Sequence, residues 1–343
     1  MKKFCSFPEI GQYRQIVKII TEHTRYVGKN ENGDRIYDHL KELPIHKYTG
    51  TVKMHGTNAG VTISKEGEIY AQSRSNIITV EKDNAGFAFF VESKKEAFAS
   101  FFEQLNFDGY DYITIFGEWC GGNIQKGVAI NGLPKMFVIF DIKYSYENIE
   151  QGDNIYLSND YIKLFRCPAQ NIFNIYDFPT YEVEIDFNHP EEIQNKIIEL
   201  TLQVEDECPV GKYFGSIGVG EGIVFTYLNE DGSKYRFKSK GLKHSNSKVK
   251  TLASVDTDKL NSVKEFVDYA VTENRLDQGI EKVFGIGGEL DIKKTGDFLR
   301  WVVSDVIKEE LDTLSDNGLE PKDVTSAISV KARGWLLEKI NKF

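Results

Sequence analysis

The sequence has few cysteines and no long apolar run. Its four cysteines are scattered over 343 residues without a Cys-x-x-Cys pair. This excludes the usual zinc spacings and a disulfide framework, and it predicts reduced thiols. No stretch approaches the length of a membrane span, and Met1 to Phe4 lack the apolar core of a signal peptide. We therefore expect a soluble, cytoplasmic protein.

The chain also lacks an overall excess of basic residues. Its net charge of −10 argues against a surface that binds nucleic acid everywhere. A local exception is the stretch from Ser233 to Lys250, which contains no acid, and we expect it to face an anion. Its cations are Lys234, Arg236, Lys238, Lys240, Lys243, Lys248 and Lys250.

The hydrophobic pattern changes character near residues 245–255, and no internal repeat is present. Strand-like alternation dominates before this point, and amphipathic helical spacing dominates after it. A chain of this length is expected to form more than one domain. We predict an α+β fold, with an antiparallel-sheet core over 1–248 and a small all-helical domain over 249–343.

Individual elements follow from periodicity and turn residues. Helices are predicted at 8–23, 86–105, 191–204, 257–271, 296–312 and 321–341. Strands are predicted at 48–55, 112–119 and 136–144, and hairpins at 59–64 with 68–73 and at 223–228 with 234–240. The region 148–188 is irregular and predicts no element.

The stretch from Thr51 to Gly60 contains the most unusual local pattern. If residues 48–55 form a strand, Lys53 and His55 lie on one face, because side chains alternate with period two. Gly56 then allows a tight turn or a close approach to a ligand. An isolated lysine in such a pattern is usually a solvated edge charge, so its interpretation depends on residues further along the chain.

A lysine that attacks a nucleotide needs several partners. The amine must be partly neutral, the phosphates need cations and a divalent metal held by carboxylates, and the base needs an aromatic platform. The chain offers a candidate for each role. They are Lys53 as nucleophile, Glu118 and Glu221 as carboxylates, Phe140 as platform, and Arg236, Lys238 and Lys240 as a cationic row on one strand face.

Each candidate alone has an ordinary structural explanation. Phe140 could be a core residue, Glu118 a strand-end charge and Glu221 a turn residue. Lysines on an edge strand discourage aggregation. The function therefore depends on the ordered set, not on any one member.

That ordered set resembles a known superfamily. The blocks are Lys53-Met54-His55-Gly56-Thr57-Asn58, Phe116-Gly117-Glu118, Phe140-Asp141, Glu221-Gly222 and Phe237-Lys238-Ser239-Lys240. In this order they resemble the covalent nucleotidyltransferases, which include ATP-dependent ligases and RNA-capping enzymes. The histidine two residues after the lysine, and the link from Gly122 to Lys126, make the chain similar to the RNA ligase 2 family. The resemblance implies a nucleotidyltransferase (ATP-grasp-like ligase) core.

The resemblance also implies a reaction and a role for each residue. Lysine would take AMP from ATP, pass it to an RNA 5′-phosphate, and a 3′-OH would then displace it. Lys53, His55, Glu118, Glu221, Lys238 and Lys240 would be catalytic. Val52, Lys53, Asn58, Arg74, Glu118, Phe140, Lys238 and Lys240 would bind ATP. Glu118 and Glu221 would bind Mg²⁺ or Mn²⁺, and Arg74, Gln125, Asp141 and Arg275 would bind RNA.

The resemblance further implies RNA ends, for example at a nick in duplex RNA, as the substrate of a monomeric, phage-like repair enzyme. Related DNA ligases and capping enzymes carry a β-barrel after the core, whereas helices are predicted here. Two alternatives remain open. One is a DNA ligase or a GTP-using capping enzyme, and the other is a non-catalytic nucleic-acid-binding module with a decayed pocket.

Overall fold

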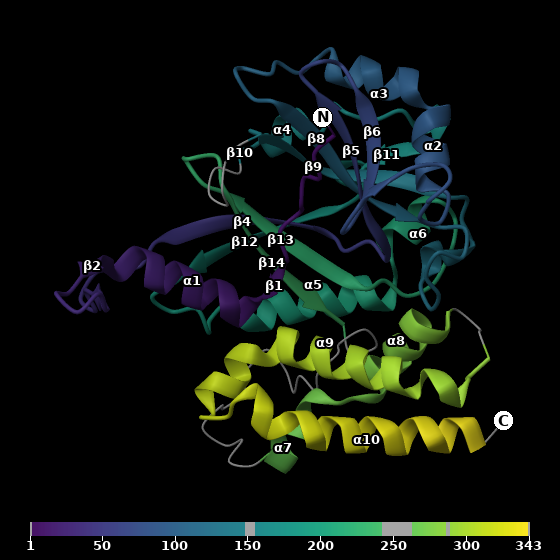
Figure 1. Cartoon of the computed structure of the whole chain (residues 1–343). Coiled ribbons are helices and arrows are strands. Elements are labelled where there is room, and N and C mark those ends of the chain that lie inside the picture. Colours follow the sequence, from purple (N-terminus) through teal and green to yellow (C-terminus); the bar gives the residue numbers. More distant parts are fainter. Residues whose placement is uncertain (1, 148–154, 242–262, 286–288, 342–343) are drawn as a thin grey trace. The chain divides into compact units, whose positions relative to one another are not determined.

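The computed structural model describes residues 2–147, 155–241, 263–285 and 289–341 (Figure 1). The chain divides into two compact units. The first comprises Met1–Asn188 and Gln203–Ser239, and the second comprises His189–Leu202 and Lys240–Phe343. The second unit thus includes a segment that the predicted division at residue 248 assigns to the first domain. The predicted boundary at 245–255 and the cations Lys243, Lys248 and Lys250 lie outside the described residues.

Five strands form what we call the first sheet. The β13–β14 hairpin is predicted correctly, and its turn closes through Asn229 N–H donating to Ser233 O at 2.8 Å. β4 pairs antiparallel with both β12 and β13, and the short β1 lies parallel to β14. In spatial order the strands are β12 (Thr180–Asp186), β4 (Ile45–Val52), β13 (Gly222–Leu228), β14 (Lys234–Lys240) and β1 (Gly11–Gln12).

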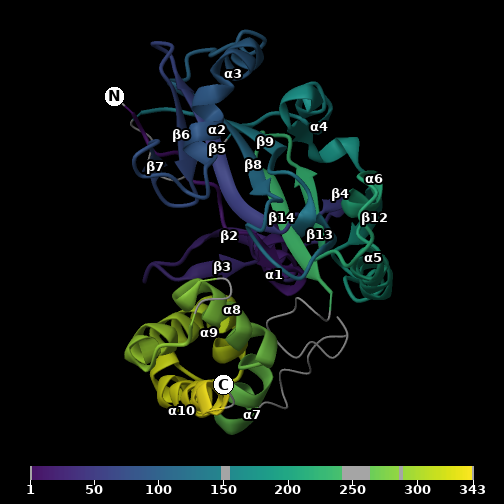
Figure 2. The ribbon, with the colours of Figure 1, turned by 90° about the vertical axis from the view of Figure 1, so that its right-hand side faces the viewer.

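The second sheet contains the predicted hairpin and the two long predicted strands. It runs in the order β10 (Ile155–Tyr156), β9 (Met136–Ser145), β8 (Tyr112–Cys120), β5 (Gly56–Ser64), β6 (Ile69–Ser73) and β7 (Ile77–Ile78), and β11 (Ile172–Asn174) pairs with β9. Both sheets can be followed in Figure 2, which turns the view by 90°.

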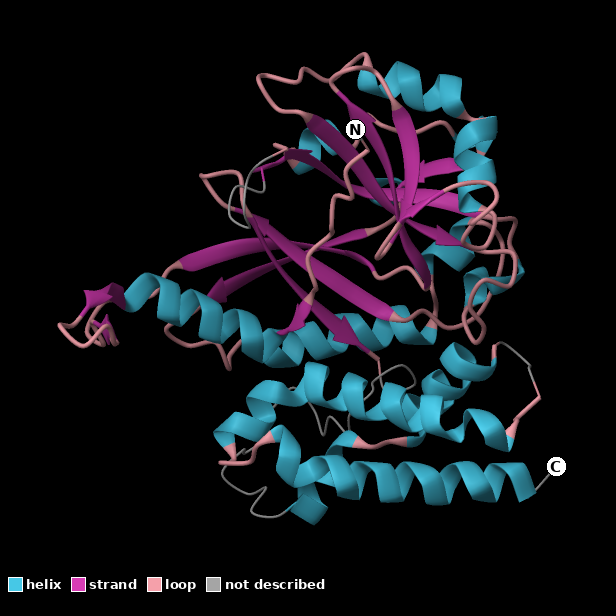
Figure 3. Ribbon diagram, in the orientation of Figure 1, coloured by secondary structure: helices cyan, strands magenta, loops and turns pink. Residues whose placement is uncertain are grey.

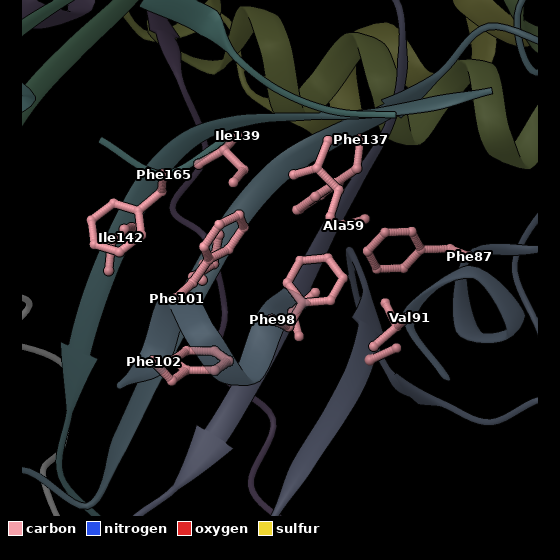
Figure 4. Close-up of a cluster of buried hydrophobic side chains, with 14 of the residues drawn as sticks. Ala59, Phe87, Val91, Phe98, Phe101, Phe102, Phe137, Ile139, Ile142 and Phe165 are labelled. Atoms are coloured by element: carbon pink, nitrogen blue, oxygen red, sulfur yellow. The ribbon is translucent and has the colours of Figure 1, made fainter. Parts of the chain in front are cut away.

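One face of the second sheet is apolar and the other carries both polar and aromatic side chains, because side chains alternate along each strand. The apolar face packs against α2 (Phe87–Ser93) and α3 (Lys95–Phe102), and rings such as Phe98 and Phe101 fill the space (Figure 4). The predicted single helix over 86–105 is therefore two helices. Lys94, with φ −121°, ends the first of them.

The remaining elements of the first unit correct the prediction in three places. The first helix, α1, begins at Tyr13, not at residue 8, and ends at Arg25. A small hairpin of β2 (Tyr26–Lys29) and β3 (Arg35–Tyr37) follows it. The region predicted as irregular contains β10, β11, β12 and the short α4 (Asn159–Ile162). The other helices are α5 (Gln194–Asp206), which spans the division between the units, and α6 (Pro209–Tyr213).

The second unit contains mainly helices (Figure 3). Besides the first part of α5, they are α7 (Val263–Ala270), α8 (Glu273–Phe284), α9 (Thr295–Asp316) and α10 (Pro321–Asn341). α8 was not predicted, although Thr272 accepts a hydrogen bond from Arg275 N–H as its N-cap. Phe266, Phe298 and Ile328 are among the fully buried side chains of this unit's core. No helix in the described part of the chain has the length and apolar character required to cross a membrane.

Candidate functional site around Lys53

Lys53 lies where the chain crosses from the first sheet to the second. β4 ends at Val52, and β5 begins at Gly56. Lys53 keeps one bond of the first sheet, because its N–H donates to Gly222 O at 2.8 Å. The prediction of one strand over 48–55 is wrong at its end, since Gly56 pairs with Cys120 of the other sheet. Lys53 and His55 therefore belong to a three-residue link and not to one strand face.

Glu221 brings Lys53 and His55 together. Its Oε2 lies 2.8 Å from Lys53 Nζ and 3.0 Å from His55 Nδ1. Only 4% of the Glu221 side chain is exposed, against 22% for Lys53. A buried carboxylate requires such charged partners. The three residues form a polar cluster at the start of β13.

The glycines on either side of Glu221 fix its position. Gly222 has φ +146°, a conformation that residues with a side chain rarely adopt. At Gly220, a Cβ would lie 2.5 Å from Val204 O, so only glycine fits. Glu221 is thus held between Gly220, which has no room for a side chain, and Gly222, which has a positive φ.

Glu118 lies on β8 beside this cluster. Its Oε1 accepts a hydrogen bond from Gly56 N–H at 3.1 Å. Burial raises the pKa of Glu118 to about 7, although the charge of Lys53 opposes this shift, and the negative charge of Glu221 adds to it. Gly56 approaches β8 so closely that a Cβ would lie 2.4 Å from Trp119 O. A half-buried carboxyl with a pKa near neutrality is typical of functional sites.

Three further predicted residues surround Gly56 and Glu118. Asn58 lies directly opposite Glu118 in the β5–β8 register. Gln125 donates from Nε2 to Gly56 O at 3.4 Å. Arg74 is exposed just after β6, and its charge lowers the pKa of Glu118.

Phe140 occupies a β-bulge. Phe116 pairs with Asp141 and Gly117 with Ile139, so Phe140 is the extra residue of β9. A bulge redirects a side chain, and bulges are frequent beside active sites. The Phe140 ring is partly exposed and lies 5.1 Å from the ring of Phe7.

Val52 and the β14 lysines complete the predicted ATP-binding set. Val52 is buried and pairs with Ile223. Lys238 lies beside Gln12 of β1, and Lys240 is the last residue of β14. Both lysines are partly exposed, which is compatible with a ligand contact.

Asp141 and Arg236 lie in the interior and require a correction. Asp141 forms ion pairs with Lys234, at 3.0 Å, and with Arg236. The exposed fractions of these three side chains are only 3%, 1% and 6%. The expected contact of Asp141 with RNA is incompatible with this burial. The predicted cationic row is also divided, because Arg236 is neutralised inside the protein.

Arg275 requires the same correction in the helical unit. Its side chain is fully buried, its Nε lies 2.8 Å from Asp305 Oδ2, and its NH2 lies 3.5 Å from Glu310 Oε1. Another nitrogen donates to Ala270 O. A guanidinium held in this way connects the helices and exposes no surface to a ligand, so the expected RNA contact of Arg275 is incompatible with its burial.

Lys234 was predicted only as one of the cations that face an anion, and this is wrong, because its buried side chain pairs with Asp141. Phe7 was not predicted at all. Phe7 gives no local signal, because its contacts come from distant strands. Among the described residues, no group of three or more His, Cys, Asp or Glu side chains could hold a metal ion by itself.

Comparison with known proteins points to one family. The model of the RNA ligase family matches residues 46–240 of the chain. A search of curated proteins with this chain finds no match. Solved structures of the Naegleria gruberi RNA ligase are similar at low identity. One with PPi has 19% identity and a TM-score of 0.43, and a variant with ATP and Mn has 18% and 0.43. Both matches cover 70% of this chain and 57% of the Naegleria chain.

Proposed function

The chain belongs to the RNA ligase family, and from this membership and the geometry around Lys53 we propose that it is an ATP-dependent RNA ligase. In the proposed reaction, the neutral Lys53 amine attacks the α-phosphorus of ATP. A P–N bond forms, the bond to pyrophosphate breaks, and the amine loses a proton. AMP then passes to the 5′-phosphate of RNA. Finally a 3′-OH attacks that phosphate, releases AMP and forms the phosphodiester bond.

The observation that carries the proposal is the cluster of Lys53, His55 and Glu221 at the crossing between the sheets. A binding module needs cations, but it does not need a lysine oriented by a buried carboxylate. The 2.8 Å contact holds the Lys53 amine at a defined point, beside the half-buried Glu118. Positioning of this kind contributes strongly to the transfer of phosphoryl groups.

Glu118 and Glu221 fit a divalent cation. The negative charge of Glu221 raises the pKa of Glu118, so a cation would relieve their mutual repulsion. Magnesium commonly takes only one or two carboxylates and completes its shell with water and phosphate oxygens. When bound, Mg²⁺ or Mn²⁺ would neutralise charge on the phosphates of ATP.

The other partly exposed residues suit ATP and the RNA end. We propose that Phe140 stacks on adenine, that Val52 and Asn58 line the nucleotide site, and that Lys238 and Lys240 bind the phosphates. Arg74 and Gln125 are proposed to engage the RNA end. Asp141 and Arg275 have no part in this proposal, because their charges are paired in the interior.

The proposed substrate is a nick in duplex RNA, sealed by a monomer. The helical domain over 249–343 is proposed to assist RNA binding and sealing. The motifs for ATP chemistry end by Lys240, and this supports such a division of labour.

The decisive experiment uses ATP labelled on the α-phosphate with Mg²⁺. After denaturation, we expect label on the protein that acid releases, as it releases a phosphoramidate. GTP in place of ATP should give no label. A nicked RNA duplex should then be sealed with release of AMP, and a nicked DNA duplex should be sealed more slowly. Labelling by GTP alone would favour a capping-type enzyme, and no labelling by either nucleotide would favour a binding module.

A further inference from the structure

The N-terminal segment Lys2–Phe7 is fixed onto the second sheet by side chains of β6. Tyr70 OH donates to Lys3 O at 2.8 Å, and Lys3 N–H donates to Tyr70 OH at 3.0 Å. Gln72 makes a second pair of bonds, donating to Cys5 O at 2.5 Å and accepting from Cys5 N–H at 3.2 Å. Tyr70 and Gln72 are two residues apart and therefore lie on one strand face. The segment is thus held at two successive points.

A third attachment places Phe7. Lys143 on β9 donates from Nζ to Ser6 O at 3.0 Å, directly before Phe7. The Phe7 ring then lies 5.0 Å from Phe116 and 5.1 Å from Phe140, the second contact edge-on at 63°. Such edge-to-face pairs are more favourable than their buried area alone suggests.

Arg236 covers the same ring from the first sheet. Its guanidinium lies 5.1 Å from the Phe7 centroid and 4.2 Å from that of Tyr156. Arg236 cannot move freely, because it is paired with the buried Asp141, the residue after Phe140. Phe7 is therefore fixed between Phe116, Phe140 and a guanidinium held by the neighbour of Phe140.

From these contacts we propose that Phe7 is a positioning residue, which fixes the ring of Phe140 at the β-bulge for stacking on the adenine of ATP. The inference rests on the proposed function. Phe140 is partly exposed, and a ring without a lateral neighbour would sample several rotamers. Phe7 restricts this freedom before the nucleotide arrives, and such preorganisation strengthens binding. Phe7 acts through Phe140 and need not touch ATP.

The experiment measures lysyl-AMP formation by the full chain over a range of ATP concentrations. Phe7→Ala should raise KM for ATP about 3- to 10-fold, as expected for loss of one aromatic pair, with little change in the maximal rate. Phe7→Tyr keeps the ring and should restore a KM near that of the wild type. In Phe140→Ala, the further change Phe7→Ala should have no additional effect on KM, because the ring that Phe7 positions is absent.

Phe107→Ala is the matched control. Phe107 is also a partly buried ring, but it packs against the apolar cluster that includes Phe98 and Phe101. The Phe107→Ala variant should have a lower thermal stability than the wild type but the same KM for ATP. If Phe107→Ala raises KM as much as Phe7→Ala, or if Phe7→Ala and Phe140→Ala act additively, Phe7 has only a structural role and the inference is wrong.

Binding of α,β-methylene ATP, which cannot transfer its AMP, separates this inference from the proposed function. A wild-type chain that neither binds this analogue nor forms lysyl-AMP overturns both. If the wild-type chain binds the analogue and forms lysyl-AMP, and Phe7→Ala binds the analogue with unchanged affinity, only the positioning role is overturned. Weaker binding of the analogue by Phe7→Ala, restored in Phe7→Tyr, supports it.

Discussion

The amine of Lys53 and the carboxylate of Glu221 lie 2.8 Å apart and form an ion pair that is largely shielded from solvent. An anionic partner favours the charged form of a lysine. Attack on phosphorus requires the neutral amine, so the Lys53 amine must lose a proton before the proposed chemistry begins.

Two substitutions of Lys53 separate charge pairing from nucleophilicity. Lys53→Arg preserves a cation beside Glu221 but should abolish covalent AMP labelling, because a guanidinium does not deprotonate near neutral pH. Lys53→Ala should also abolish labelling, and it removes a partner of the buried carboxylate. Acid-released label is measured after denaturation, and circular dichroism checks the fold. Retained labelling in either variant would place the nucleophile at another residue.

Glu118 should make stability depend on pH. Its folded-state pKa of about 7 lies above the ordinary value of 4.5, so the folded chain binds the extra proton between these values. The stability that protonated Glu118 contributes is therefore fully present below about pH 4.5 and is lost as the pH rises through about 7. Glu118→Gln can still accept the Gly56 hydrogen bond and should remove this dependence.

From pH 5 to pH 8, we expect the free energy of unfolding of the variant to rise relative to that of the wild type, by up to about 3 kcal/mol. Urea unfolding at both pH values measures the gain. An equal difference between the two proteins at both pH values would contradict the prediction.

Phe140→Ala should weaken ATP binding by about 1–3 kcal/mol, by analogy with the stacking of bases on aromatic side chains. Phe140→Tyr keeps the ring and should bind nearly as well as the wild type. Calorimetric titration with a non-transferable ATP analogue measures both. Unfolding of Phe140→Ala, in place of a selective loss of affinity, would show that the ring serves the core.

Lys238 should matter for the first step even without RNA. Loss of a cation that meets charge developing in the transition state slows a reaction by about 10²-fold or more. We expect this for Lys238→Ala and Lys240→Ala in the rate of lysyl-AMP formation. Lys47→Ala is the control, since Lys47 is an exposed strand lysine paired with Glu182. Similar rates in all three variants would contradict a phosphate-binding role for β14.

Arg275→Ala should destabilise the helical unit by about 3–5 kcal/mol, because it breaks an ion pair in which both side chains are fully buried. Arg300→Ala, which breaks an exposed pair with Asp297 in the same unit, should have little effect. Thermal unfolding compares the two. Weaker RNA binding by Arg275→Ala at unchanged stability would restore the original expectation of an RNA contact.

Local patterns predicted the hairpins and long strands well. The β13–β14 hairpin depends on alternation and on a turn in which Gly232 adopts φ +82°. The alternating pattern and the glycine are both visible in the sequence. β12 carried a similar signal, because Tyr181, Val183 and Ile185 alternate with acids, but it was overlooked within an irregular region.

Long-range pairing could not be predicted in this way. Asp141 and Arg236 are 95 positions apart, and nothing near either residue shows that they neutralise each other. The end of β4 at Val52 has the same cause. Lys53 to His55 leave the first sheet because a distant strand, β8, pairs with β5, and no local preference of these residues indicates it.

The three-residue link from Lys53 to His55 also limits how the two sheets can move. An extended chain advances at most about 3.6 Å per residue, so Val52 and Gly56 cannot separate by more than about 14 Å. Any relative movement of the two sheets is therefore restricted where this link joins them. The residue proposed to carry AMP lies on the link, so entry and exit of a nucleotide would displace the outer ends of the strands more than Lys53 itself.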